Sequence, residues 1–178
     1  MKRELLIHIA FLVSFFIFVT IFKGWFSLAY WPFWLGGLVG TFLPDVDHVL
    51  YVLMLKPYEL TSQRISYLLE RKELKKIVEL LYETRSERRG LIFHTAGFQM
   101  LFLVLTFWMV TSSGSLFGRG LVLAFSLHLL IDQIMDLNDI GSMANWNTVS
   151  LVDLTDRKKA SLYWLAAVIA LCVFGFLM

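Results

Sequence analysis

Long runs of hydrophobic residues, separated by short polar stretches, are the main pattern in this sequence. Five such runs cover residues 5–22, 25–43, 91–110, 121–137 and 162–178. Each run approaches the roughly 20 residues that a helix needs to cross the hydrocarbon core of a bilayer. The pattern therefore predicts an all-α fold, a polytopic membrane helical bundle of four to five transmembrane helices.

A different pattern occupies residues 57–90, where charged residues alternate with apolar residues. The apolar positions recur at roughly helical spacing, which is typical of amphipathic helices that lie on a membrane surface. They are Ile65, Leu68, Leu69, Leu74, Ile77, Val78 and Leu81. We expect one integral membrane domain over residues 1–178, with residues 57–90 as an amphipathic helical insertion.

Composition supports a membrane protein and excludes several other classes. Hydrophobic residues make up 58% of the 178 residues and charged residues only 17%, a balance that an ordinary soluble domain of this size does not have. The net charge of +2 is too small to indicate nucleic-acid binding. Cys172 is the only cysteine, which excludes an internal disulfide framework and a cysteine zinc knuckle.

The positions of the basic residues predict which side of the membrane each connection faces. If the N-terminus is cytoplasmic, the inner side receives the two N-terminal basic residues, nine in residues 56–89 and three in residues 157–159. Of the 16 Lys and Arg residues, Lys23 and Arg119 then lie outside. The positive-inside rule therefore predicts a cytoplasmic N-terminus in a bacterial or archaeal cytoplasmic membrane, with the 57–90 insertion on the cytoplasmic side.

All four histidines lie in or beside apolar segments, and two of them, His48 and His128, have an aspartate within a few residues. Ionisable groups at membrane depth are costly and are usually functional. With the predicted orientation these groups lie toward the cytoplasmic ends of their helices, and His128 shares a helix face with Asp132 because the two are four residues apart. The set predicts a metal site on the cytoplasmic side with these candidate ligands: His8, Asp45, Asp47, His48, His94, His128 and Asp132.

The cost of burying these groups favours a bound cation over separate hydrogen bonds. A charged residue near the centre of a membrane helix costs about 2.5–3.5 kcal/mol on insertion scales, and less near the interface. A divalent metal binds such ligands with on the order of 10 kcal/mol, whereas one hydrogen bond contributes about 1 kcal/mol. Mixed imidazole and carboxylate ligands suit zinc, manganese, iron or nickel. We expect one or two divalent metal ions, with zinc as the first candidate.

Several of these residues also have a purely structural interpretation. His8 could pair with a glutamate one turn away, Pro44 could end a helix whose successor the aspartates cap, and His94 could be a hydrogen-bonded interfacial side chain. The pair of His128 and Asp132 is harder to explain in this way, because both lie one turn apart within an apolar run. A shared metal site accounts for all of these residues together.

The same residues fall in motifs that resemble a known family. The motifs are His8 in the first helix, a segment ending in LPDVDH (37–48), an Arg-Gly pair followed by a histidine (89–94) and HxxxD (128–132). They look like those of the bacterial inner-membrane metal-dependent hydrolases of the YdjM-like, LexA-regulated type, over most of the chain up to residue 137. More distantly, the order of ligands is similar to that of zinc-dependent phospholipase C. The resemblance implies hydrolysis of a phosphoester.

Two of the motifs depart from the family pattern. The family usually has HRGxTHS before its third helix, whereas this chain has RRGLIFHT, with Arg88 in place of the first histidine and one extra residue. A Thr-Pro turn usually follows HxxxD, and here the sequence continues QIMDLND. Asp136, one turn beyond Asp132, is a possible substitute ligand.

The residues and the resemblance together predict a membrane-embedded metal-dependent hydrolase that cleaves a phosphoester of a lipid-like substrate at the cytoplasmic leaflet. We expect Arg85, Arg88 and Arg89 to hold the phosphate, because guanidinium groups suit phosphate. Asp45 is the predicted catalytic proton acceptor. The expected partners are the lipid bilayer and this substrate, with no nucleic acid. Two alternatives stay open: a divalent-metal transporter or sensor, and a structural membrane protein whose metal only joins the helices.

Overall fold

All regular structure in the computed structural model is helical. It describes residues 2–84, 87–88, 90–139, 141–147 and 153–178, and no strand occurs among them. The α-helices of these residues are α1 (Lys2–Lys23), α2 (Trp31–Phe42), α3 (Val46–Leu50), α4 (Leu60–Glu70), α5 (Leu74–Glu83), α6 (Ala96–Ser112), α7 (Leu116–Asp139) and α8 (Arg157–Leu177). Shorter helical turns cover Leu28–Tyr30, Tyr51–Leu55 and Ala144–Trp146.

Four helical segments are long and apolar enough to cross a membrane, judged by length and composition. They are Leu5–Lys23, Leu28–Leu55, Leu116–Asp139 and Arg157–Leu177. The predicted all-α bundle is therefore confirmed, with four segments that could span a membrane.

The remaining apolar helix, α6, is shorter than predicted, with 17 residues. It begins at Ala96 and not near residue 91, because Thr95 adopts an extended conformation and caps it. The Thr95 hydroxyl accepts a hydrogen bond from the backbone N–H of Phe98 at 3.2 Å, which satisfies one of the N–H groups that the first turn of a helix leaves unpaired. His94 therefore lies before the helix and not in its first turn.

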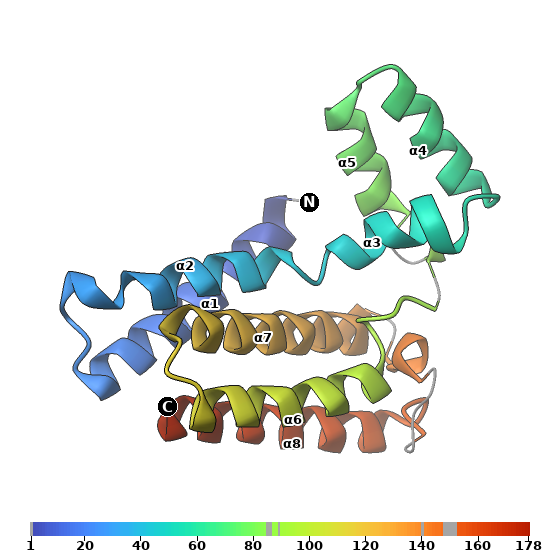
Figure 1. Cartoon of the computed structure of the whole chain (residues 1–178). Coiled ribbons are helices and arrows are strands. Elements are labelled where there is room, and N and C mark those ends of the chain that lie inside the picture. The colour runs from blue at the N-terminus through green and yellow to red at the C-terminus, as the bar shows by residue number, and fades with distance from the viewer. Residues whose placement is uncertain (1, 85–86, 89, 140, 148–152) are drawn as a thin grey trace.

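Helix α7 forms the centre of the bundle. Figure 1 shows it between α2 on one side and α6 and α8 on the other. In the most apolar stretch of α7, 78% of the residues are buried inside the protein. In the corresponding stretches of α1 and α8, 22% are buried. Polar groups on α7 are consequently enclosed by protein, while α1 and α8 leave most of their apolar side chains exposed, as lipid-facing helices do.

Glycines allow α2 and α7 to approach until their backbones touch. A Cβ atom at Gly36, Gly40 or Gly120 would overlap a backbone carbonyl oxygen of the opposite helix. Small residues serve this purpose in membranes, where close van der Waals packing drives helix association. The close approach fixes α2 against the helix that carries His128.

A turn at Pro44 interrupts the helix between α2 and α3. Proline has no backbone N–H to donate to the preceding turn, and a turn over residues 43–45 separates the two helices. Helix α3 then continues away from α2 along the same side of the molecule (Figure 1). The break places Asp45, Asp47 and His48 beside one end of α7.

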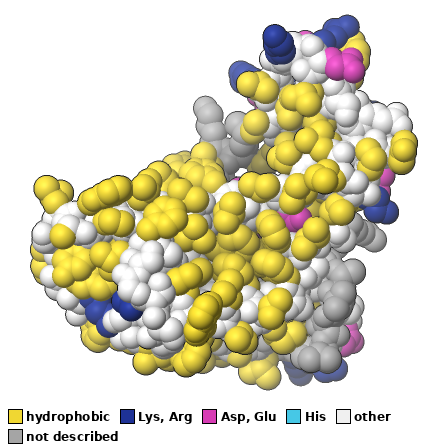
Figure 2. Space-filling view, viewed as in Figure 1, with side chains coloured by type: hydrophobic (Ala, Val, Ile, Leu, Met, Phe, Trp, Pro, Cys, Tyr) yellow, Lys and Arg dark blue, Asp and Glu magenta, His cyan; other side chains and the backbone are white. Residues whose placement is uncertain are grey.

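Helices α4 and α5 form a hairpin at this end of the molecule, beyond the bundle (Figure 1). Their facing sides bury Ile65 and Ile77, which pack with Tyr51 and Val52 in a small separate core. Figure 2 shows charged side chains on the hairpin and toward the ends of the bundle, while apolar side chains cover most of the visible bundle surface. The amphipathic helices predicted within residues 57–90 are present as α4 and α5.

Candidate metal centre

Three buried side chains from two helices converge at the end of the bundle near α3. His8 comes from α1, and His128 and Asp132 come from successive turns of α7. Nε2 of His8 lies 3.2 Å from Asp132 Oδ1, and Nε2 of His128 lies 3.2 Å from Asp132 Oδ2. One ligand atom from each residue lies within 4.8 Å of the others, and the group could hold a metal ion.

The spacing and burial of these atoms fit a divalent cation. Four-coordinate zinc with bonds of about 2.0–2.1 Å places neighbouring ligand atoms about 3.3 Å apart. The two separations of 3.2 Å here go to different oxygens of Asp132, and one ligand atom from each of the three residues lies within 4.8 Å of the others. Both ring nitrogens of His128 are buried and make no hydrogen bond of normal geometry to a described residue, although Nε2 lies 3.2 Å from Asp132 Oδ2. Buried polar atoms normally have a partner. A cation between His128 and Asp132 would supply a partner for Nε2.

His94 reaches this group from the segment before α6. Its Nε2 lies 3.0 Å from Asp132 Oδ2, and its Nδ1 lies 3.3 Å from Asp47 Oδ2. The Asp47 carboxylate also accepts hydrogen bonds from the backbone N–H groups of Ile92 at 3.1 Å and Phe93 at 2.6 Å. Metal-ligating histidines usually have such a carboxylate behind the ring. We therefore interpret Asp47 as the group that orients His94, whereas the sequence led us to expect a direct ligand.

Asp45 lies at the open edge of the group. It immediately precedes α3, yet its side chain makes no capping hydrogen bond to that helix. Its Oδ1 lies 3.6 Å from His128 Nε2, and the side chain is 56% exposed. Capping therefore does not explain this aspartate. Its position gives the site a carboxylate that faces solvent beside a buried imidazole.

The His48 ring stacks on the ring of His94, with 5.1 Å between the centroids, and its Nδ1 contacts Arg88. Nε of Arg88 donates a hydrogen bond to His48 Nδ1 at 3.2 Å, and its Nη1 donates to the Thr84 hydroxyl at 2.9 Å. Arg88 is buried and is the one predicted phosphate-binding arginine that the structure describes. Arg85 and Arg89 lie outside the described residues.

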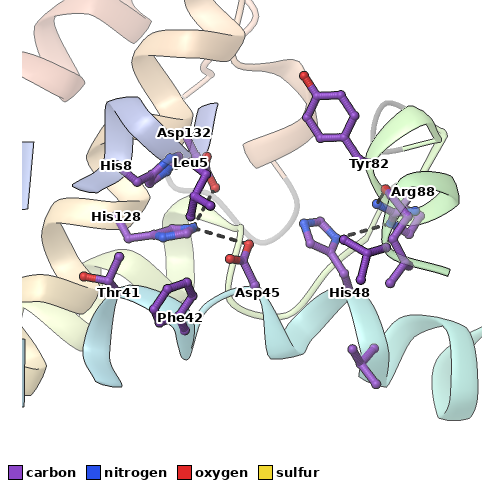
Figure 3. Close-up of a pocket in the computed structure, with 13 residues that line it drawn as sticks. Leu5, His8, Thr41, Phe42, Asp45, His48, Tyr82, Arg88, His128 and Asp132 are labelled. Atoms are coloured by element: carbon purple, nitrogen blue, oxygen red, sulfur yellow. Dashed lines mark hydrogen bonds and ion pairs between the residues drawn. The ribbon is translucent and has the colours of Figure 1, made fainter. Parts of the chain in front are cut away.

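A cavity of about 490 Å³ connects the two groups. Figure 3 shows His8, His128 and Asp132 at one end, with His48 and Arg88 at the other. Most of the remaining wall is apolar, and its side chains are partly exposed at the surface of the molecule. An apolar cavity with a few polar groups at fixed positions is typical of a small-molecule site. The apolar lining residues are Leu5, Phe42, Val49, Val78 and Leu81.

Asp136, the possible substitute ligand, has a different partner. Its Oδ2 accepts a hydrogen bond from Trp146 Nε1 at 2.7 Å, and the buried Trp146 ring lies 5.5 Å from the ring of His94. Asp136 therefore holds Trp146 against the site. Sequence reasoning did not find this contact or the support that Thr84 gives to Arg88, because both join segments whose relative placement no local pattern encodes.

Comparisons with known proteins found no matching family model, no matching curated protein and no matching solved structure. The resemblance to the YdjM-like hydrolases therefore stays a prediction. The functional argument below rests on the geometry and chemistry of the site itself.

We expect Asp47→Asn to weaken metal binding roughly 10- to 100-fold, which is typical when a group that orients a ligand is lost. The amide retains the size of the side chain, but its nitrogen donates and does not accept. Only one of its two terminal atoms can accept, so it cannot accept the hydrogen bonds of Ile92, Phe93 and His94 together. Competition with a chromophoric zinc chelator in detergent micelles measures the change. A loss as large as that from removing Asp132 would show that Asp47 is a direct ligand.

Proposed function

We propose that this protein is a membrane-embedded metal-dependent hydrolase that cleaves a phosphoester of a lipid-like substrate at the cytoplasmic leaflet. The observation that carries the proposal is the cavity, which joins the buried ligand group, Asp45 and an apolar wall. Structural metal sites are closed, whereas catalytic sites keep an open position. A ligand group that opens into a cavity of about 490 Å³ favours the catalytic class.

The proposed role of each residue follows from its contacts. His8, His128 and Asp132 would hold the ion, with His94 as a further ligand, and we propose zinc, as one ion or two, because of the mixed imidazole and carboxylate set. When bound, such an ion supplies Lewis acidity and lowers the pKa of a water molecule to about 7. Asp45 would accept the proton, since it is the exposed carboxylate beside His128.

The cytoplasmic location is supported by the distribution of basic residues and by the surface of α5. This helix exposes Leu74, Val78 and Tyr82, which lie four residues apart on one face. Val78 and Tyr82 also line the cavity. Helices with an exposed apolar stripe beside a charged face lie in membrane interfaces. The stripe would give a lipid-like substrate an apolar route from the inner leaflet to the site.

An assay of the purified protein tests this proposal. Zinc-loaded protein in detergent micelles is incubated with phospholipids and isoprenoid phosphates, and release of the phosphate-containing product is measured. We expect Asp45→Asn to lower turnover by at least about 100-fold, the usual contribution of a general base, with unchanged zinc content. Asp139→Asn, an exposed change at the end of α7, is the control. Equal activity of the wild type, Asp45→Asn and His128→Ala would contradict the proposal.

A divalent-metal transporter or sensor is the alternative from another class. Transporters hold their ligands near the bilayer midplane, whereas His8 is six residues from the start of α1 and Asp132 is seven from the end of α7. Zinc flux into proteoliposomes without hydrolysis would favour transport. Thermal stability that depends on zinc, without hydrolysis and without zinc flux, would favour a purely structural metal.

A further inference from the structure

We propose that the cavity admits the hydrocarbon chain of a membrane lipid through a lateral opening between α1 and α5. Four side chains line this opening, which we call the apolar mouth: Leu5 of α1, Phe42 at the end of α2, Val49 of α3 and Val78 of α5. The chain would contact the mouth while the polar end of the lipid lies at the buried ligand group. That the polar end is a phosphoester rests on the proposed function, whereas the position of the chain does not.

The cavity is polar at its buried end and apolar where it reaches the surface. The three residues of the ligand group are at most 6% exposed, whereas the four side chains of the apolar mouth are 44% to 51% exposed. A side chain that lines a cavity and is also half exposed marks the place where the cavity meets its surroundings. Exposed apolar side chains around such an opening indicate an apolar ligand or a membrane surface.

The apolar mouth is continuous with surfaces that a bilayer would cover. Leu5 begins the potential membrane span Leu5–Lys23, and Phe42 and Val49 lie in the potential span Leu28–Leu55. Exposed apolar side chains continue from the mouth along both segments, and they include Leu6, Ile9, Leu38, Val39 and Val46. A molecule in the hydrocarbon core of the membrane can therefore reach the cavity sideways, without passing through water.

Helix α5 supplies the part of the mouth that lies beyond the bundle. Figure 1 shows this helix transverse to the helices of the bundle, the direction of a helix that lies in the plane of a membrane. Val78 belongs to its exposed apolar stripe with Leu74 and Tyr82. Amphipathic helices bury such a stripe about 5–10 Å into the boundary between headgroups and acyl chains. The mouth would then lie at the depth where the chain of a lipid begins.

A lipid has the chemistry to occupy both ends of the cavity. A cation at the ligand group attracts the anionic oxygens of a headgroup, and the apolar mouth suits a methylene chain. His8 lies six residues from the start of α1, or roughly 9 Å along the helix. A headgroup therefore has only a short distance to move from the membrane interface while its chain stays at the mouth. The volume of about 490 Å³ suits one small amphiphile and not a folded partner.

Spin labels on α5 test whether the mouth faces lipid. Val78→Cys is introduced into full-length protein that carries Cys172→Ser, because Cys172 is exposed, and the labelled protein is reconstituted into vesicles of phosphatidylethanolamine and phosphatidylglycerol. We expect the label to collide with oxygen, which dissolves in lipid, and to be shielded from a water-soluble nickel chelate. Equal access of the chelate to this label and to the control label would overturn the inference.

Lys76→Cys carries the control label. Lys76 lies two residues from Val78, which places it on nearly the opposite face of the helix, and its side chain is 65% exposed. We expect this label to collide with the nickel chelate more than with oxygen. The comparison requires neither bound zinc nor turnover.

Binding of alkylphosphonates tests whether the mouth holds the chain, because their carbon–phosphorus bond resists hydrolysis. Zinc-loaded protein in detergent micelles is titrated with butylphosphonate and with dodecylphosphonate by calorimetry. Val78→Trp and Val49→Trp each place a large ring in the mouth. We expect either change to weaken dodecylphosphonate binding by at least roughly 10-fold, the effect of two methylene groups that lose their apolar contacts. Butylphosphonate binding should stay at the wild-type level.

Val104→Trp is the matched control for these substitutions. Val104 is an exposed valine of α6 outside the cavity wall, so both phosphonates should bind this variant as they bind the wild type. Unchanged dodecylphosphonate binding after filling the mouth, or an equal loss for both phosphonates, would overturn the inference. A protein with a lipid-facing label and chain-length selectivity that hydrolyses no phosphoester would refute the proposed function and support this inference.

Discussion

Replacing Asp132 with alanine is expected to lower the affinity for zinc by more than about 100-fold, beyond the effect of losing a group that only orients a ligand. Its carboxylate lies within 3.2 Å of ring nitrogens of His8, His94 and His128. Removing it leaves three imidazoles without the negative charge that a divalent cation needs in a buried site. Elemental analysis of purified protein and titration with a zinc chelator measure the loss.

Asp139→Ala is the matched control for this change. Asp139 lies on the same helix but is exposed, so the substitution removes the same charge without touching the buried group. We expect wild-type zinc content in this variant. If Asp132→Ala retained the wild-type zinc affinity, the buried group would not be a metal site and the hydrolase proposal would fail with it.

Gly120→Ala is expected to lower the free energy of unfolding by about 3 kcal/mol or more, at the upper end of the range for overpacking. A Cβ atom at this position would overlap the backbone carbonyl oxygen of Phe33 on α2. A backbone cannot rotate away as a side chain can, so α2 and α7 must separate along their whole contact. Thermal unfolding in detergent micelles, followed by circular dichroism, measures the effect.

Gly118→Ala supplies a control two residues earlier on α7. There the new Cβ atom meets the end of the flexible Met109 side chain, with Met109 Sδ at 3.1 Å, which can move aside. Alanine also favours a helix over glycine by roughly 1 kcal/mol. We expect no loss of stability in this variant. Equal destabilisation by the two substitutions would mean that general disturbance of α7, and not the contact with α2, limits stability.

The part of the site that the sequence predicts best lies within single elements. His128 and Asp132 share a face because a helix places residues four apart on one side, and Pro44 ends α2 because proline lacks a backbone N–H. The start of α6 was misjudged, since the apolar run continues back to Leu91. In the structure the backbone N–H groups of Ile92 and Phe93 bind the Asp47 carboxylate, and this distant partner keeps the segment out of the helix.

The roles of the individual ligand candidates depended on contacts between elements. All four histidines have the same side chain and similar apolar surroundings in the sequence. The Asp47 carboxylate contacts Nδ1 of His94, and the Arg88 guanidinium contacts Nδ1 of His48. These partners are 47 and 40 residues away along the chain. Hydrogen-bond partners at such separations follow from how the helices pack, so no local pattern could show which partner each histidine has.

The all-α fold and the presence of helices long and apolar enough to cross a membrane were already encoded along the chain. The length and hydrophobicity of the apolar runs predict helices that can cross a bilayer. A helix needs about 20 apolar residues to cross the hydrocarbon core, and its backbone N–H and C=O groups must hydrogen-bond within the protein there. Tertiary packing decided the rest: the burial of α7 at the centre, the close approach at Gly120, the grouping of His8 with Asp132, and the cavity beside them. Those features require that residues far apart in sequence meet at distances of a few ångströms, which only the packed helices determine.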